Sequence, residues 1–303
     1  MRRWHSLVCV LGLVATFVTS CGSGSSDSSQ IVVTTNILGD VVRNVVGDAA
    51  EVLVLMQPNA DPHSFGISAQ DAAAMNSAGL VIYNGLGLEE NVTRNVESAA
   101  EQGIPTLAVG DRIDPIQYTE GDSAGMPDPH FWTDPERMIT AVDVIEETIR
   151  TEVDGIDAHA VTRNAENYRA QLRELDTSMV ENLDTIPVQR RKLVTNHHVL
   201  GYFAQRFGFT VVGALVPSGT TLAAPSASDL QSLVGAIQST GVPAIFIDSS
   251  QPDRLARVLA EQAGVQVKIV PLYSESLSPP GTPGDTYLGM MRANADAIVT
   301  GLR

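Results

Sequence analysis

The sequence has little cysteine and no excess of basic residues. Only Cys9 and Cys21 are present, which is too few for a disulfide framework. Acidic residues outnumber basic residues by 35 to 19, so the formal net charge at pH 7 is −16. Proteins bind nucleic acid through a basic surface, and this charge therefore excludes a nucleic-acid-binding role. Beyond the N-terminal region, no apolar run approaches the roughly 20 residues that a membrane-spanning helix requires.

The extreme N-terminus has the pattern of an export signal. Arg2 and Arg3 precede an apolar run at 7–18, which is short for a membrane span and typical of a signal peptide. Small residues then lead to Cys21 in an arrangement that resembles a bacterial lipobox, which implies cleavage before Cys21 and attachment of a lipid to it. The alternative is an ordinary signal peptide with an incidental cysteine. Residues 21–30 are rich in Gly and Ser and predict a flexible tether.

The rest of the chain predicts the α/β fold class. Its length of about 280 residues favours two domains over one core. Short apolar runs alternate with helical patterns, which predicts parallel sheets with helices on their faces. Strands are expected at 31–35, 51–56, 80–84, 106–109, 192–195, 209–215, 244–248 and 265–270. The helices expected between them include one near 88–102 and one near 198–206. Residues 157–184 instead predict one long, stiff helix with a single apolar stripe.

These patterns give a complete predicted domain organisation. It consists of two β/α lobes with parallel-rich sheets, joined by one long rigid helix. The expected segments are a lipoprotein signal peptide at 1–20, a tether at 21–30, an N-terminal lobe at 31–152, a linking helix at 153–187 and a C-terminal lobe at 188–303.

Four of the six histidines lie in three short polar motifs. The tripeptide Asp-Pro-His occurs at 61–63 and again at 128–130, and His197 and His198 adjoin in the third motif. Ligands of open parallel sheets gather at the carboxyl ends of strands. His63 and His197 each follow a predicted strand, and Asp285 lies in the loop after the last strand. Three imidazoles and one carboxylate suit a divalent first-row metal, so the sequence predicts a metal site between the lobes.

The motifs together resemble a known family. In chain order they are ADPHSF, NGLGLE, DPHFWTDP, HHVLGYFAQRFG and GDTYLGMM, and the similarity extends from about residue 31 to the end. They resemble the metal-binding lipoproteins of zinc and manganese ABC importers, the cluster A-I substrate-binding proteins. The resemblance implies two lobes joined by a rigid helix, with a metal ion buried between them. It places the ligands at His63, His130, His197 and Asp285. It selects His197 over His198 because the ligand in this family motif lies five residues before the tyrosine, which is Tyr202 here.

The ligand set favours zinc over manganese. Manganese members of the family often carry Glu at the position of His197, and nitrogen ligands suit zinc while oxygen ligands suit manganese. The expected bound ion is therefore Zn²⁺, with Mn²⁺ as the alternative. One feature departs from many zinc members, which carry a His-rich and acidic insert before the second ligand. This chain has only QYTEGDSAGMP there, without histidine.

The resemblance also implies partners and a location. We expect a monomeric, non-enzymatic receptor, anchored through Cys21 to the outer face of the bacterial cell membrane, that passes its ion to an ABC permease and its ATPase. Asp285 would be the most mobile ligand. Four further side chains are expected close to the ligands, namely Asp61, Asp128, His198 and Asp248. Two other functions stay open: a zinc-dependent hydrolase, if three histidines and a water bound the metal, and an adhesin.

Overall fold

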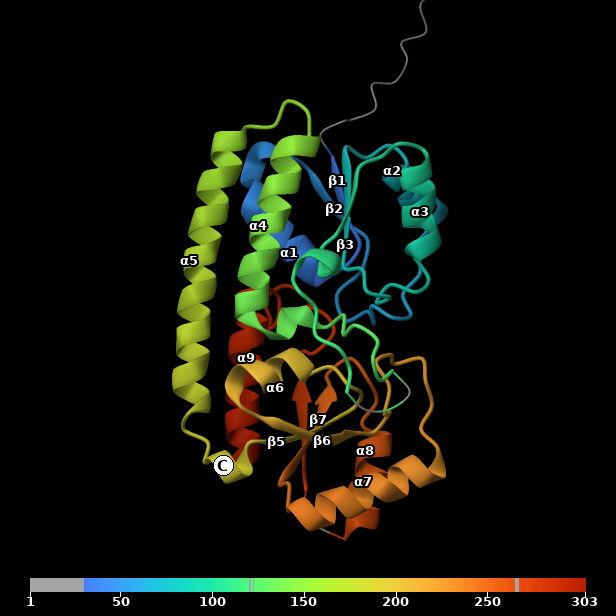
Figure 1. Ribbon diagram of the computed structural model, residues 1–303, viewed down its shortest axis with the longest axis vertical. Helices are drawn as coiled ribbons and strands as arrows, with labels where there is room; N and C mark the ends of the chain where they lie inside the picture. Colours follow the sequence, from blue (N-terminus) through green and yellow to red (C-terminus); the bar gives the residue numbers. More distant parts are fainter. Residues whose placement is uncertain (1–29, 120, 122, 265–266) are drawn as a thin grey trace, which may run out of the picture.

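The structure is a computed structural model that describes residues 30–119, 121, 123–264 and 267–303. It consists of two α/β lobes arranged along the long axis of the molecule (Figure 1). The predicted signal peptide and the tether with Cys21, up to residue 29, lie outside the described residues. In the described ranges, no helix is both long enough and apolar enough to cross a bilayer.

The N-terminal lobe contains a parallel sheet of four strands in the order β2-β1-β3-β4. The strands are β1 (Ile31–Val33), β2 (Val52–Val54), β3 (Leu80–Tyr83) and β4 (Thr106–Ala108). The helices are α1 (Asn36–Val46), α2 (Ala69–Met75), α3 (Thr93–Glu101) and α4 (Pro135–Glu152). Alternate strand residues enter two separate cores, because successive side chains point to opposite faces. Ile31 and Val33 pack with residues of α1 and α4, whereas Val32 packs with Met75 and Val96 of α2 and α3.

The C-terminal lobe repeats this arrangement with two pairs of parallel strands. The strands are β5 (Lys192–Thr195), β6 (Thr210–Ala214), β7 (Ala244–Asp248) and β8 (Lys268–Leu272). Strand β5 pairs with β6, β7 pairs with β8, and β5 lies beside β7. The helices are α6 (Gly201–Phe207), α7 (Ala227–Thr240), α8 (Arg254–Ala263) and α9 (Tyr287–Leu302). Val194 and Ile245 contribute to a core with α7 and α8, whereas Leu193 and Phe246 share a core with α9.

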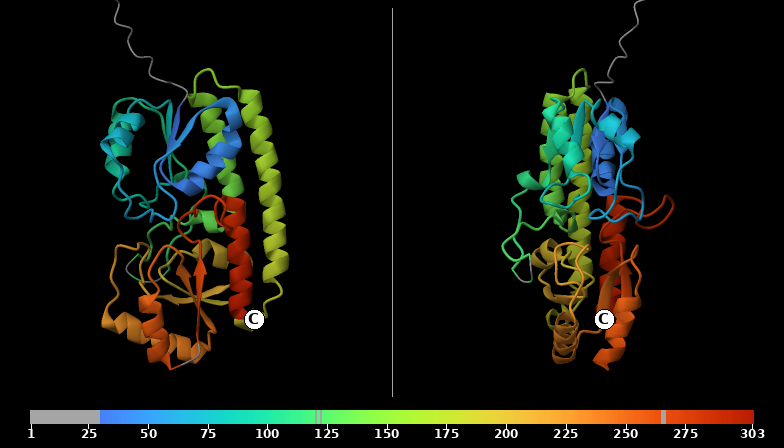
Figure 2. Two further views of the ribbon diagram at one scale, coloured as in Figure 1. Left: turned by 180° about the vertical axis from the view of Figure 1, so that it is seen from behind. Right: turned by 90° about the vertical axis from the view of Figure 1, so that its right-hand side faces the viewer.

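Helix α5 (Ala158–Leu183) runs beside both lobes (Figure 2) and packs against α1, α4 and α9. Its predicted apolar stripe is confirmed, since every member is buried: Val161, Tyr168, Leu172, Leu175, Met179 and Leu183. One hydrophobic core therefore continues along α5 from β1 to the end of α9. This architecture confirms the predicted fold class, while the predicted domain boundaries stay predictions.

Two predicted helices begin later in the structure than the sequence pattern indicated. The helix expected from residue 88 begins at Thr93, because the Glu89 carboxylate turns back and accepts hydrogen bonds from the backbone N–H groups of Asn84 and Gly85. The helix expected near residue 198 begins at Gly201. The carbonyl of His197 bonds instead to the Thr195 hydroxyl, which turns the chain sharply at the end of β5.

Candidate metal centre

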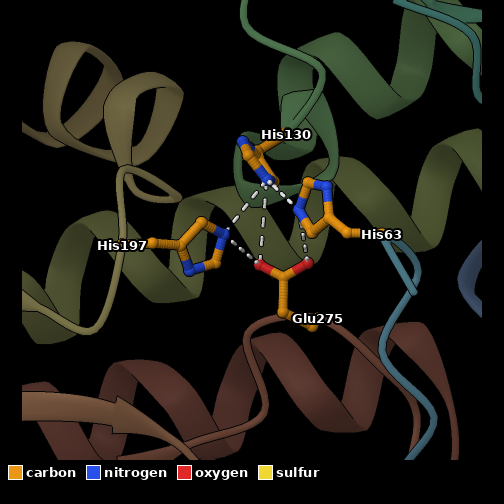
Figure 3. A group of neighbouring side chains, drawn as sticks. All are labelled: His63, His130, His197 and Glu275. Carbon is orange, nitrogen blue, oxygen red and sulfur yellow. Dashed lines mark hydrogen bonds and ion pairs between the residues drawn. The ribbon is translucent and has the colours of Figure 1, made fainter. Parts of the chain in front are cut away.

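The structure brings three of the four predicted ligands together in one buried cluster. The side chains of His63, His130 and His197 point toward one another and toward Glu275 (Figure 3). One ligand atom from each residue lies within 4.8 Å of the other three. His63 follows β2, His197 follows β5 and Glu275 follows β8, so three of the four lie at carboxyl ends of parallel strands. His130 lies on the connection that leads into α4.

The distances in this cluster suit a small tetrahedral ion. Nε2 of His130 lies 3.3 Å from Nε2 of His63 and 3.4 Å from Nε2 of His197. Zinc–nitrogen bonds of about 2.0–2.1 Å in a tetrahedron separate neighbouring ligand atoms by about 3.4 Å. Oε1 of Glu275 lies 3.1 Å from His197 and 3.8 Å from His130, and Oε2 lies 3.7 Å from His63. The four groups therefore surround a point with room for one metal ion.

The predicted fourth ligand, Asp285, does not belong to this cluster. Its carboxylate accepts a hydrogen bond from the backbone N–H of Gly281 and closes a Pro- and Gly-rich turn before α9. Glu275 takes its place because it lies three residues after β8 ends, whereas Asp285 lies thirteen residues after. The structure thus brings another acid of the same loop to the three histidines. The rule that ligands gather at strand ends would have identified Glu275.

His63 is held by the backbone of its loop rather than through its ring. Oδ1 of Asp61 accepts a hydrogen bond from the backbone N–H of His63, at 2.9 Å. Oδ2 of Asp61 accepts a bond from the Thr221 hydroxyl of the other lobe, at 2.6 Å. Nδ1 of His63 is buried and has no hydrogen-bond partner in the described part of the chain. Asp61 therefore fixes the position of the loop and links the two lobes.

The ring of His130 is oriented by a carboxylate. Oδ1 of Asp128 lies 2.7 Å from Nδ1 of His130 and also accepts a bond from the His130 backbone N–H. Burial raises the pKa of Asp128 to about 7. When this carboxylate is ionised it can only accept hydrogen bonds, so Nδ1 then carries the proton and the lone pair of Nε2 faces the cluster. Such carboxylate–histidine pairs orient metal ligands in many sites.

His197 and His198 have different surroundings. Nδ1 of His197 lies 3.0 Å from the side-chain amide of Asn196, and His197 is 1% exposed. His198 is only half-buried, its ring lies beside that of Tyr118, and its backbone N–H bonds to Ser218. The structure thus directs His197, not His198, into the cluster.

Glu275 lies on a loop that is fixed from both lobes. Asp248 at the end of β7 accepts bonds from the backbone N–H groups of Ser274 and Glu275 and from the Ser274 hydroxyl. Trp132 donates its indole N–H to the Ser274 carbonyl. Asn36 of the N-terminal lobe bonds to the hydroxyl of Ser276. The one carboxylate of the cluster is therefore rigidly placed, which differs from the mobile ligand expected at Asp285.

Burial leaves the cluster with little charge of its own. It lowers the pKa of His63 and of His197 to about 4, and it lowers the pKa of His130 well below its ordinary value. Burial likewise raises the pKa of Glu275 well above its ordinary range. A divalent cation would reinforce the first tendency and reverse the second, because it favours neutral imidazole and ionised carboxylate ligands.

The buried oxygens of Glu275 provide a test of whether a cation fits. Neither Oε1 nor Oε2 accepts a hydrogen bond from any described residue, although the side chain is almost fully buried. Leaving such a carboxylate without a partner is costly. Three imidazole nitrogens and this carboxylate are together the donor set of a divalent first-row metal. The residues present therefore fit a metal ion.

Comparison with known proteins identifies the family. A profile of the family described as "Zinc-uptake complex component A periplasmic" matches residues 31–301. The chain belongs to this family. It is 32% identical to the zinc-binding protein TroA of Treponema pallidum, over 99% of this chain and 98% of that protein. It is 27% identical to the manganese-binding lipoprotein MntA of Halalkalibacterium halodurans, over 97% of each chain.

A solved structure extends the comparison to the fold. The structure of the periplasmic zinc-binding protein TroA from Treponema pallidum superposes with a TM-score of 0.82, at 31% identity, over 90% of this chain and 99% of that one. These results confirm the resemblance that the motifs indicated. The chain is a metal-binding, substrate-binding protein of the type that serves ABC importers, and the family consists of such receptors rather than enzymes. The hydrolase alternative is therefore not supported.

Proposed function

We propose that this protein is an extracytoplasmic, high-affinity zinc receptor that captures one Zn²⁺ and delivers it to an ABC permease driven by an ATPase. His63, His130, His197 and Glu275 would be the four ligands. The observation that carries the proposal is the spacing of the three Nε2 atoms around a buried carboxylate without donors. A fourth protein ligand also distinguishes a receptor from a catalytic zinc site, which keeps one position open for water.

Zinc is preferred to manganese because of the donor set. Three of the four ligands are nitrogen, which suits zinc, whereas manganese prefers oxygen. Manganese is the second candidate, and one feature favours it. Both oxygens of Glu275 face the histidines, so the carboxylate could supply two oxygen ligands and raise the coordination number. The names of several relatives, such as MntA, also refer to manganese.

The proposed location rests on the N-terminal sequence. Cleavage before Cys21 and lipid attachment there would tether a monomeric receptor to the outer face of the cell membrane, beside its permease. Relatives named as lipoproteins support this proposal. Labelling with a radioactive fatty acid, compared between the wild type and Cys21→Ala, tests it. Equal labelling of the two proteins would refute lipid attachment at Cys21.

Calorimetric titration of chelator-stripped protein tests the proposed cargo. We expect one Zn²⁺ per chain, bound much more tightly than Mn²⁺, and we expect zinc to displace manganese in competition. Tight manganese binding with weak zinc binding would reverse the choice of metal. If neither ion binds, the receptor proposal is refuted.

A further inference from the structure

A segment of the N-terminal lobe reaches across to the C-terminal lobe beside the metal centre. This bridging segment comprises the described residues 116–119 and 123–128, which precede His130 directly. Its two ends are joined by a bridge between Gln117 and Pro127. Tyr202 of α6 fixes it from the other lobe, since its hydroxyl accepts a bond from the Ile116 N–H and donates one to the Asp128 carbonyl.

The ring of Tyr118 packs tightly against the other lobe at Gly219. A Cβ atom on Gly219 would lie 2.6 Å from the ring atoms Cε2 and Cζ and from the hydroxyl oxygen of Tyr118. Such a contact is far too close for any residue other than glycine. The Gly219 backbone N–H also donates a hydrogen bond to the hydroxyl of Ser123. The position of Tyr118 thus depends on close apposition of the two lobes.

The hydroxyl of Tyr118 reaches the pair of residues that orients one metal ligand. Its oxygen lies 3.1 Å from Nδ1 of His130 and 3.5 Å from the carbonyl oxygens of His198 and Gly219 in the other lobe. Tyr118, Asp128 and His130 therefore form one connected group behind the Nε2 atom that faces the metal position.

A cavity of about 450 Å³ lies on the outer side of this group. Tyr118 and Asp128 line it together with residues of α6 and β6, whereas His130 does not. The tyrosine and the carboxylate thus separate His130 from the cavity.

We propose that Tyr118 is a positioning residue that couples the seating of the C-terminal lobe to the orientation of His130. Gly219 fixes the ring, the ring places the hydroxyl, and the hydroxyl lies against Nδ1 of His130, the nitrogen that Asp128 also holds. His130 is then correctly directed at the metal only when the two lobes are in contact. This inference rests on the proposed metal-receptor function and names one device by which the lobes control the site.

The variant Tyr118→Phe tests the hydroxyl while keeping the ring on Gly219. We expect its zinc affinity, measured by competition with a chelator, to fall about ten-fold, as for other partners of metal ligands. We also expect the visible spectrum of the Co²⁺-loaded protein to change, because the spectrum reports the geometry around the metal. The matched control is Tyr202→Phe. It removes a hydroxyl of α6 that bonds to the backbone of the same segment and not to the His130 ring, and its cobalt spectrum should match the wild type.

The variant Gly219→Ala tests the coupling from the other lobe. It leaves every group around the metal in place but displaces the Tyr118 ring. We expect the same spectral change, and we expect no additional loss of affinity when it is combined with Tyr118→Phe. Gly235→Ala, whose added Cβ meets nothing within 4 Å, is the glycine control.

The outcomes separate this inference from the receptor proposal. If wild-type protein binds zinc but Tyr118→Phe matches it in affinity and cobalt spectrum, Tyr118 has no positioning role. If Tyr118→Phe and Tyr202→Phe change the spectrum equally, the effect is a general loosening of the segment and the inference is wrong. If the wild type binds no metal, the receptor proposal itself fails.

Discussion

The substitution Glu275→Gln addresses the one ligand that the sequence did not identify. Glutamine keeps the size of the side chain and one oxygen but removes the negative charge. The loop should keep its conformation, because Asp248 and Trp132 hold it through bonds to the backbone and to Ser274. Loss of a partner that only supports a metal ligand weakens binding 10–100-fold, so loss of a direct anionic ligand should reach at least about 100-fold, or about 2.8 kcal/mol.

This loss of affinity has a measurable consequence for thermal stability. Zinc at about 1,000 times the wild-type Kd stabilises the wild type by about 4.1 kcal/mol, whereas the same zinc is about 10 times the Kd of the variant and gives about 1.4 kcal/mol. For a chain of this size, about 1 kcal/mol shifts Tm by about 2–4 °C. The zinc-dependent rise in Tm should therefore be smaller in the variant by about 5–11 °C.

The metal-free protein should respond in the opposite direction. Burial raises the pKa of Glu275, so its charged form is unfavourable without a cation. An uncharged amide at this position should leave the stability of the metal-free protein unchanged or increased. Melting curves with and without zinc, together with chelator competition, measure both effects on one preparation.

Asp285→Asn is the matched control for this experiment. It also neutralises an acid of the same loop, but that acid lies outside the cluster and bonds only to the turn at Gly281. We expect wild-type zinc affinity. Normal zinc binding by Glu275→Gln combined with weak binding by Asp285→Asn would refute Glu275 as the fourth ligand and favour Asp285, which the motifs implied.

Three further predictions concern the histidines and the packing of the lobes. Alanine at any one of the three histidine ligands should weaken zinc binding by more than about 100-fold in calorimetric titration, whereas His198→Ala should stay near wild type. In metal-free protein, the folded pKa of His197 of about 4 lies below the unfolded value of 6.5. The unfolded chain then takes up the proton first, so His197 alone should contribute a loss of stability of up to about 3 kcal/mol between pH 6.5 and 4, and urea unfolding of His197→Gln should show a loss smaller by that amount than the wild type. Gly39→Ala would place a Cβ 2.4 Å from Cγ2 of Val54 and should destabilise the fold by about 1–3 kcal/mol in urea, whereas Gly235→Ala in α7 should be neutral or stabilising.

The fold could be predicted largely from hydrophobic periodicity. Seven of the eight predicted strands overlap closely with observed ones, and the eighth is displaced toward Leu272 at the end of β8. The stripe on α5 was evident because helical spacing and burial coincide there. The missed helix starts had a different cause. Glu89 and His197 lie where apparent helical patterns begin. The Glu89 carboxylate and the His197 carbonyl instead accept hydrogen bonds from preceding residues, and the spacing of apolar residues does not reveal such bonds.

The histidines of the site were predictable and its carboxylate was not. Repeated Asp-Pro-His motifs and strand-end positions identify His63, His130 and His197 without any coordinates. The choice between Glu275 and Asp285 depends on which acid faces away from the local backbone. The Asp285 carboxylate accepts a hydrogen bond from the Gly281 N–H, whereas the Glu275 carboxylate accepts none from the described residues. This difference arises from tertiary packing, and the sequence signals it only through the shorter distance of Glu275 from the end of β8.

The placement of the ligands bears on how the ion can be released. The core that follows α5 and α9 is continuous between the lobes, so rigid separation of the lobes would expose side chains such as Tyr168 and Leu175, which are fully buried. Burial of side chains of this size contributes about 1.5–3 kcal/mol each, which makes wide opening costly. The polar bonds that cross between the lobes near the metal are fewer and individually weaker, of about 0.5–1.5 kcal/mol each, and include that of Asp61 with Thr221. Loosening of the loops around the site is therefore the less costly route, and it would act first on His63, whose Nδ1 lacks any hydrogen-bond partner among the described residues.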